Sequence, residues 1–145
     1  ERLLADVIGL DWAYVHDEAC RWEHVMSENV ERRILAVLGN PTTSPYGNPI
    51  PGLELLGAPA QPINDHAVRM AELAGADSQA VVIRRLSEHA QSDQDLIVTL
   101  REVGIVPNAR VTVTRKDRSF VVTTPGHDGL ELSEEMAHSI FVETA

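Results

Sequence analysis

The sequence is poor in cysteine and in long apolar runs. Its 145 residues include one cysteine, Cys20, so no disulfide can form within the chain, and this usage fits a reducing cytoplasm. No run of 18 apolar residues occurs and no basic-then-apolar leader opens the chain, which argues against membrane spans and secretion signals. We therefore expect a cytoplasmic protein with no membrane partner.

Basic residues are scarce as well. Twelve of them stand against 22 acidic residues, for a net charge of −10 that divides evenly between 1–56 and 57–145. A phosphate backbone requires clustered lysine and arginine, so we expect this chain alone not to bind DNA. The sequence also lacks GxGxxG, Walker, HExxH and CxxC motifs.

Prolines gather in one part of the chain and divide it. Such a segment disfavours helices and central strands and favours extended backbone. It predicts a linker region over 40–66, which overlaps the end of a helical part at 1–56 and leads into a β part at 67–145. Six of the eight prolines lie there: Pro41, Pro45, Pro49, Pro51, Pro59 and Pro62.

Apolar spacing predicts the elements on each side of this region. Helices are expected at 1–8, from an Asp11 cap to about 26, and from a Ser27 cap to about 38. A capping box at Ser92 and Asp95 predicts another helix through 102. Together these patterns predict an α+β protein, with a helical part followed by a small, partly closed β-barrel. Short strands are expected at 67–73, 80–86, 110–115, 120–124 and 140–143, with turns at 116–118 and 126–129.

The second predicted helix carries four candidate metal ligands, His16, Cys20, Glu23 and His24. On a regular helix they share an arc of about 100°. Thiolate, imidazole and carboxylate donors suit a divalent transition metal better than calcium or magnesium. Two other readings stay open: Cys20 as a small buried apolar residue beside a solvated Glu–His pair, and Cys20 as a nucleophile activated by histidine.

Two candidate oxygen ligands, Glu88 and Gln91, come just before the predicted Ser92 cap. The pattern places them in a loop, from which they could reach a metal held by the helical part. Polar residues in a loop are more often simply solvated.

Several motifs resemble the diphtheria toxin repressor and iron-dependent regulator family. The longest is HDEACRWEHVMS at 16–27. Its continuation is VERR at 30–33 and SPYGNPIPGL at 44–53, and looser matches follow at 107–113, 125–127 and 135–138. The resemblance implies a helical metal-binding and dimerisation domain at 1–56, then an SH3-like β-barrel at 67–145. It also implies that the family's winged helix-turn-helix would precede Glu1.

The resemblance assigns roles to the candidate ligands. Cys20, Glu23 and His24 match the primary regulatory metal site, which an upstream methionine completes. The ancillary site matches Glu1 and His16 of the helical part and Glu88 and Gln91 of the barrel. Ser44 and Asn48 match residues that hold an anion beside the ancillary metal, with an arginine upstream of Glu1.

The resemblance also implies the metal. Manganese-specific relatives usually carry a carboxylate at the Cys20 position and lack the barrel, so Cys20 and the barrel both point to Fe²⁺. Thiolate ligands favour softer metals than manganese, and Co²⁺, Ni²⁺, Mn²⁺ and Zn²⁺ are possible surrogates.

The expected function is that of the regulatory portion of an iron-dependent repressor, with no enzymatic activity. It would act as a homodimer and reach operator DNA through the upstream domain. The alternatives are a small thiol enzyme using Cys20 and His24, and a manganese-responsive regulator. The proline-rich segment could also dock on the barrel, although the barrel's few aromatics (Phe120 and Phe141) argue against it. The resemblance places the dimer interface on Leu3, Val7, Trp22 and Met26.

Overall fold

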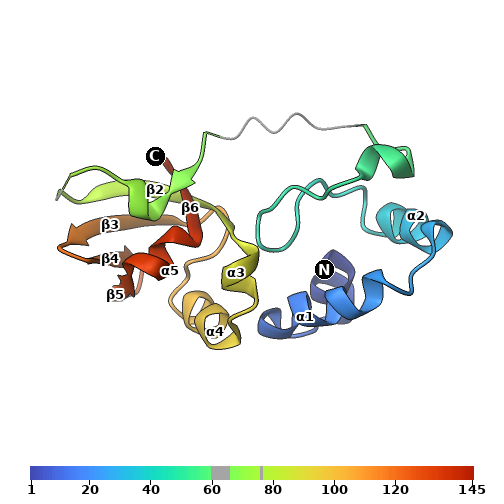
Figure 1. Cartoon of the computed structure of the whole chain (residues 1–145), viewed down its shortest axis with the longest axis horizontal. Helices are drawn as coiled ribbons and strands as arrows, with labels where there is room; N and C mark the ends of the chain where they lie inside the picture. Colours follow the sequence, from blue (N-terminus) through green and yellow to red (C-terminus); the bar gives the residue numbers. More distant parts are fainter. Residues whose placement is uncertain (60–65, 76) are drawn as a thin grey trace. The chain divides into compact units, whose positions relative to one another are not determined.

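The computed structural model describes residues 1–59, 66–75 and 77–145. They group into two compact units, Glu1–Asn64 and Asp65–Ala145 (Figure 1). The centre of the expected linker, 60–65 with Pro62, lies outside the described residues. None of the helices described is long and apolar enough to cross a membrane.

Helices form the first unit. The π-helical segment η1 (Leu3–Ile8) ends at Gly9, whose φ of 75° suits glycine. Helix α1 (Trp12–Glu23) begins where the Asp11 side chain accepts a hydrogen bond from the Ala13 amide. The predicted Asp11 cap is thus confirmed.

Helix α1 is shorter than the spacing predicted, because it ends at Glu23 rather than near residue 26. Helix α2 (Glu28–Val37) begins behind a Ser27 cap with extended backbone, at φ −80° and ψ 153°. The chain must therefore leave the helical conformation before it reaches Ser27.

Between residues 42 and 50 the proline-rich segment is not extended, contrary to prediction. Thr43 and Pro49 form an antiparallel bridge, and the Ser44 amide donates to the Asn48 carbonyl at 2.7 Å. The segment thus closes into a loop, which we call the 42–50 loop. Its prolines sit at turn and bridge positions, where a missing N–H costs little. The short 3-10 helix η2 (Leu53–Leu56) follows.

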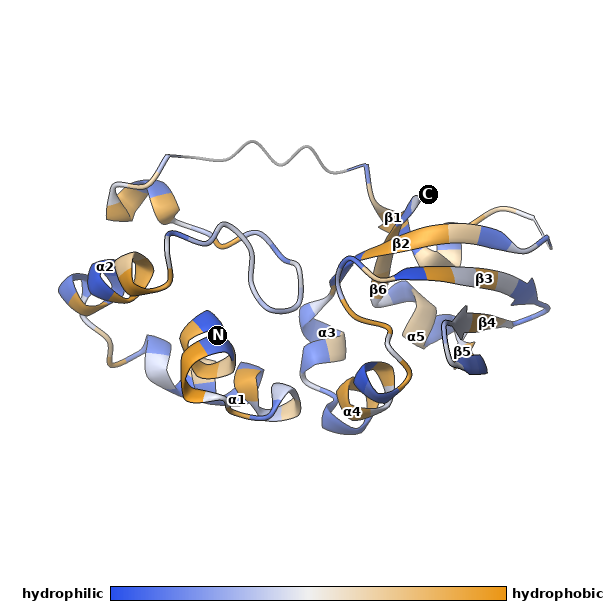
Figure 2. Cartoon of the chain, turned by 180° about the vertical axis from the view of Figure 1, so that it is seen from behind, coloured by the Kyte–Doolittle hydropathy of each residue, from blue (hydrophilic) through white to orange (hydrophobic). Residues whose placement is uncertain are grey.

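A six-stranded antiparallel sheet forms the second unit, in the order β1-β6-β2-β3-β4-β5. Register shifts between Ile83 and Arg85 and between Val122 and Thr124 bend the sheet. Figure 2 shows the hydrophobic centre of β2, where Val81 and Ile83 are fully buried. The strands are β1 (Val68–Arg69), β2 (Gln79–Leu86), β3 (Arg110–Lys116), β4 (Ser119–Thr124), β5 (His127–Ser133) and β6 (Ile140–Thr144).

Two parts of the sheet unit differ from the predicted strands. The strand expected at 67–73 is reduced to β1, and the 3-10 helix η3 (Met70–Glu72) follows it. Met70 and Ala71 are both buried, and a strand with one face on the core would expose one of two neighbouring residues. The turn expected at 126–129 lies at 125–126, and β5 begins at His127.

Short helices complete this unit. The predicted cap of α4 (Gln94–Glu102) is wrong by one residue: Asp93 caps it by accepting from the Leu96 amide at 3.0 Å. Ser92 instead ends α3 (Glu88–Gln91), in a stretch expected to be a loop. Helix α5 (Glu134–His138), which was not predicted, precedes β6.

Candidate metal centre

Glu1, His16 and Cys20 form a line of polar contacts in the helical unit. Glu1 Oε1 lies 3.1 Å from His16 Nδ1 and joins the start of the chain to α1. Cys20, one helical turn after His16, places its Sγ 3.8 Å from His16 Nε2. The contacts depend on α1, because the 3.6-residue repeat brings positions 16 and 20 to one face.

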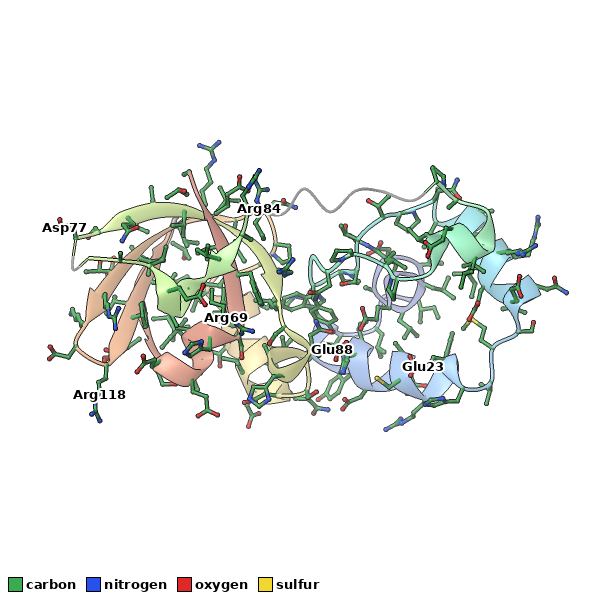
Figure 3. The ribbon with its side chains drawn as sticks, turned by 45° about the horizontal axis from the view of Figure 1, so that its top comes forward. Glu23, Arg69, Asp77, Arg84, Glu88 and Arg118 are labelled. Carbon is green, nitrogen blue, oxygen red and sulfur yellow. The ribbon has the colours of Figure 1, made fainter. Side chains whose placement is uncertain are left out.

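Glu23 and His24 lie at the C-terminal end of the same helix. Glu23 is the last residue of α1 and His24 is its C-cap. Glu23 Oε1 lies 3.5 Å from His24 Nε2, and the two side chains are 64% and 78% exposed. Figure 3 labels Glu23 near the end of α1. The pair is therefore open to solvent.

These donors are not gathered around a single point. Within the described ranges, no group of three or more His, Cys, Asp or Glu side chains is arranged to hold a metal ion. Their chemistry does fit one, because an exposed thiol, two imidazoles and two carboxylates are ligands that a borderline divalent metal accepts.

The 42–50 loop holds the two residues expected to bind an anion. Ser44 is buried, and its Oγ accepts a hydrogen bond from the Tyr46 amide at 3.2 Å. Asn48 is half-buried and joins Ser44 through its backbone carbonyl. The loop therefore holds both residues on one short stretch of backbone.

Arg2 fixes this loop to the start of the chain, a role the sequence did not predict. Its Nε donates to the Thr43 carbonyl at 2.7 Å, and its Nη2 donates to the Ser44 carbonyl at 3.2 Å. A sequence carries no signal for such contacts, because backbone carbonyls accept whatever the residue type. Arg2 therefore places a positive charge beside Ser44 and next to Glu1 in the chain.

Tyr46 is the loop's second anchor and was also missed. Its ring lies 4.9 Å from the Trp12 ring, and its hydroxyl donates to the Trp12 carbonyl at 2.6 Å. Burial, together with the negative charge of Glu1, raises the pKa of this hydroxyl well above its usual range. Tyr46 thus stays neutral and ties the loop to the first turn of α1.

The two candidate ligands of the sheet unit lie on α3. Glu88 is exposed at the start of that helix (Figure 3). Gln91 is only 3% exposed, and its Nε2 donates to the Leu86 carbonyl at 2.9 Å. The Gln91 side chain is therefore held within its own unit, while Glu88 projects into solvent.

The residues expected at the dimer interface differ in exposure. Val7 is 58% exposed, whereas Leu3, Trp22 and Met26 are half-buried. Trp22 Nε1 donates to Glu18 Oε1 at 2.8 Å, which holds the indole against its own helix. These side chains thus keep apolar surface in contact with solvent.

Family models match both units. A model described as iron dependent repressor, metal binding and dimerisation domain matches residues 1–52, and a FeoA domain model matches residues 74–144. The fold is therefore a helical metal-binding and dimerisation domain followed by an SH3-like domain, as predicted.

Named relatives agree with these matches. The iron-dependent repressor IdeR of Mycobacterium tuberculosis is 58% identical over 146 residues, covering 99% of this chain and 64% of that protein. The diphtheria toxin repressor of Corynebacterium efficiens is 44% identical over 145 residues, covering 99% of this chain and 62% of that protein. The chain thus spans less than two thirds of the length of these relatives.

Solved structures share the fold over the whole chain. A manganese-dependent transcriptional repressor in complex with manganese matches with a TM-score of 0.80 and 27% identity, covering 100% of this chain and 66% of the other. The IdeR of T. acidophilum matches with a TM-score of 0.78 and 25% identity, covering 99% and 62%.

These matches define a class, the metal-dependent repressors, of which the chain carries two domains. The chain belongs to the diphtheria toxin repressor and iron-dependent regulator family. One expectation needs correction: the barrel does not separate iron from manganese proteins, because a manganese-dependent repressor covers this chain completely.

Proposed function

We propose that this chain is the metal-sensing and dimerising part of an iron-dependent transcriptional repressor. The observation that carries the proposal is the donor set of α1, with His16, Cys20, Glu23 and His24 on one helix and Glu1 in contact with His16. The division into domains at 1–56 and 67–145 belongs to the proposal, and the two compact units support it.

Two metal sites are proposed. Cys20, Glu23 and His24 would hold the primary ion, because positions i, i+3 and i+4 share a helix face. Glu1 and His16 would hold the ancillary ion. Glu88 and Gln91 of the sheet unit would assist, although Gln91 would first have to leave its contact with the Leu86 carbonyl. Ser44 and Asn48 would take an anion there.

Fe²⁺ is the proposed metal. With the barrel no longer informative, the argument rests on Cys20, because a thiolate favours a softer ion than Mn²⁺. When bound, the ion would supply a positive charge around which these donors gather. Co²⁺, Ni²⁺, Mn²⁺ and Zn²⁺ remain suitable surrogates in solution, because affinity in vitro follows the Irving–Williams order.

The proposed mechanism is a population shift. Glu1 precedes η1 while His16 lies on α1, so an ion bound to both would hold η1 in one position relative to α1. Coupling of about 1–3 kcal/mol is typical between allosteric sites and is enough for a switch. In a longer chain this change would control operator binding through an upstream winged helix-turn-helix.

A homodimer built on Leu3, Val7, Trp22 and Met26 is part of the proposal. Its support is the apolar surface that η1 and α1 leave partly exposed. Trp22→Glu would place a charge in that interface, so we expect it to elute from gel filtration at the volume of a monomer. An elution volume equal to that of the wild type would argue against this interface.

An anaerobic Co²⁺ titration followed by absorbance tests the metal site. We expect saturable thiolate-to-metal and d–d bands in the wild type. The thiolate band should be lost in Cys20→Ala, because Cys20 is the one cysteine in the sequence. His24→Asn should weaken Co²⁺ binding about ten-fold or more.

His127→Asn is the matched control, because it removes an exposed histidine from β5, outside the proposed sites. Its titration should equal that of the wild type. Absence of bands at millimolar Co²⁺, or equal loss in both histidine variants, would contradict the metal proposal.

One observation favours a second candidate, a small thiol enzyme. The line Glu1–His16–Cys20 resembles a carboxylate, base and nucleophile, with His16 rather than His24 beside the thiol. Such an enzyme would hydrolyse p-nitrophenyl acetate without metal and lose that activity in His16→Asn. The metal proposal expects no turnover that depends on His16.

A further inference from the structure

Three contacts within the helical unit close a ring around the start of the chain. Glu1 Oε1 lies 3.1 Å from Nδ1 of His16 on α1. Arg2 donates to the backbone of the 42–50 loop, and Tyr46 of that loop donates to a carbonyl in the first turn of α1. The start of the chain, the loop and α1 are therefore each in contact with the other two.

Arg2 joins the start of the chain to the loop through two donors of one planar group. Its Nε lies 2.7 Å from the Thr43 carbonyl and its Nη2 lies 3.2 Å from the Ser44 carbonyl. A planar pair of donors restrains the orientation of the loop backbone as well as its position. The ion pair of Arg2 with Asp6 is local and partly exposed, and surface pairs of that kind contribute little.

The backbone joins this anchor directly to Glu1. Glu1 precedes Arg2 in the chain, and the Glu1 carbonyl accepts a hydrogen bond from the Ala5 amide at 3.0 Å. One side chain and one peptide bond therefore separate the loop backbone from a proposed ligand of the ancillary ion.

We infer that Arg2 is a positioning residue, which couples order in the 42–50 loop to metal binding by Glu1 and His16. The inference rests on the proposed function, because it takes that pair as ligands. An ion bound by the pair holds the start of the chain against α1, and Arg2 passes this restraint to the loop backbone. Such coupling is reciprocal, so a loop held in place raises metal affinity by the factor by which the metal stabilises the loop.

The sign of the effect separates this role from simple electrostatics. A guanidinium beside Glu1 repels a divalent cation, so by charge alone Arg2→Gln should strengthen Co²⁺ binding. Loss of the anchor should instead weaken it. We expect about ten-fold weaker binding, the low end of what loss of an outer-shell partner costs. Arg2→Lys keeps the charge but loses the planar pair of donors, so it should weaken binding at least as much.

Isothermal titration calorimetry of the whole chain with Co²⁺ measures this affinity. The binding that is lost in Glu1→Gln identifies the ion held by Glu1 and His16. Arg32→Gln is the matched control, because Arg32 also pairs with a carboxylate one turn away, Glu28, and donates to a distant carbonyl, that of Leu55. It should bind Co²⁺ like the wild type. Circular dichroism verifies that each variant folds, and Arg2→Lys remains informative if Arg2→Gln does not.

Amide hydrogen exchange measures the coupling in the other direction. The Ser44 and Tyr46 amides are hydrogen-bonded within the loop, the first to the Asn48 carbonyl and the second to Ser44 Oγ. Saturating Co²⁺ should slow their exchange about ten-fold in the wild type and in Arg32→Gln, because coupling is reciprocal. It should leave their exchange unchanged in Arg2→Gln.

Three outcomes would overturn the inference, and they differ in what else they overturn. Affinity and loop protection equal to those of the wild type in Arg2→Gln would show that the loop and the ion are independent, while the metal site stands. Tighter Co²⁺ binding in Arg2→Gln would leave Arg2 an electrostatic role alone. Unchanged Co²⁺ binding in Glu1→Gln would show that the pair holds no ion, and the proposed ancillary site would fail together with the inference.

Discussion

At the scale of single residues, Tyr46 connects a surface loop to a helix. Its side chain is fully buried, yet its hydroxyl has a partner in the Trp12 carbonyl. A buried hydroxyl without such a partner would cost about 1–3 kcal/mol, so the contact decides whether the residue stabilises the loop. The same burial raises the pKa of the Tyr46 hydroxyl.

Tyr46→Phe should lower the free energy of unfolding by about 1 kcal/mol at neutral pH, because the Trp12 carbonyl loses a donor. The wild type should lose this advantage at alkaline pH. Above the usual tyrosine pKa of about 10, the unfolded chain releases a proton that the folded chain keeps, so stability falls as the pH rises. Urea unfolding between pH 7 and pH 11 measures both effects.

Tyr14→Phe provides the control, because Tyr14 lies on α1, the helix that Tyr46 contacts, and is 53% exposed. It should leave both the stability and its pH dependence close to those of the wild type. A pH dependence shared by Tyr46→Phe and the wild type would show that another group causes the alkaline loss.

At the scale of elements, sequence periodicity predicted most of the strands but not the one at the β5 edge of the sheet. Strands β2, β3, β4 and β6 were predicted because alternate residues face one core. Strand β5 was not, since it lies at the sheet edge and its polar sequence around Gly129 reads as a turn. Its pairing with β4 comes from tertiary contacts that no local pattern encodes.

The candidate site, too, could be predicted from the sequence only in part. The donors of α1 could be predicted as a group because one helix face sets their spacing. The contact between Glu1 and His16 adds a separate segment, and here only the family resemblance joined the two. Arg2 could not be predicted, because its partners are backbone carbonyls. The burial of Gln91 could not either, because α3 read as a loop.

At the scale of the whole molecule, each unit has its own core, and the spectroscopic probes lie in one of them. Both tryptophans and both tyrosines are in the helical unit, at positions 12, 22, 14 and 46. The sheet unit has phenylalanine as its only aromatic residue type. Tryptophan fluorescence therefore reports on the helical unit, whereas circular dichroism reports on both.

Ile83→Ala should destabilise the sheet unit by about 2–5 kcal/mol, because it removes a fully buried side chain from β2. We expect the sheet transition seen by circular dichroism to move to lower urea while the fluorescence midpoint stays fixed. Val98→Ala, which alters a side chain 40% exposed on α4, should shift neither transition by much. A joint shift of both signals in Ile83→Ala would show that the units unfold together.

The register of the last strand also bears on how the protein is made. Strand β6 lies between β1 and β2, so Val142 pairs with Val68 and Ile83, which precede it by more than 50 residues. During synthesis this sheet has to wait until its final strand leaves the ribosome, and pairing over such separations is slow. The contacts of η1 and α1 are local and available much earlier. A nascent chain would therefore present its thiol, imidazole and carboxylate groups while the sheet is still unformed.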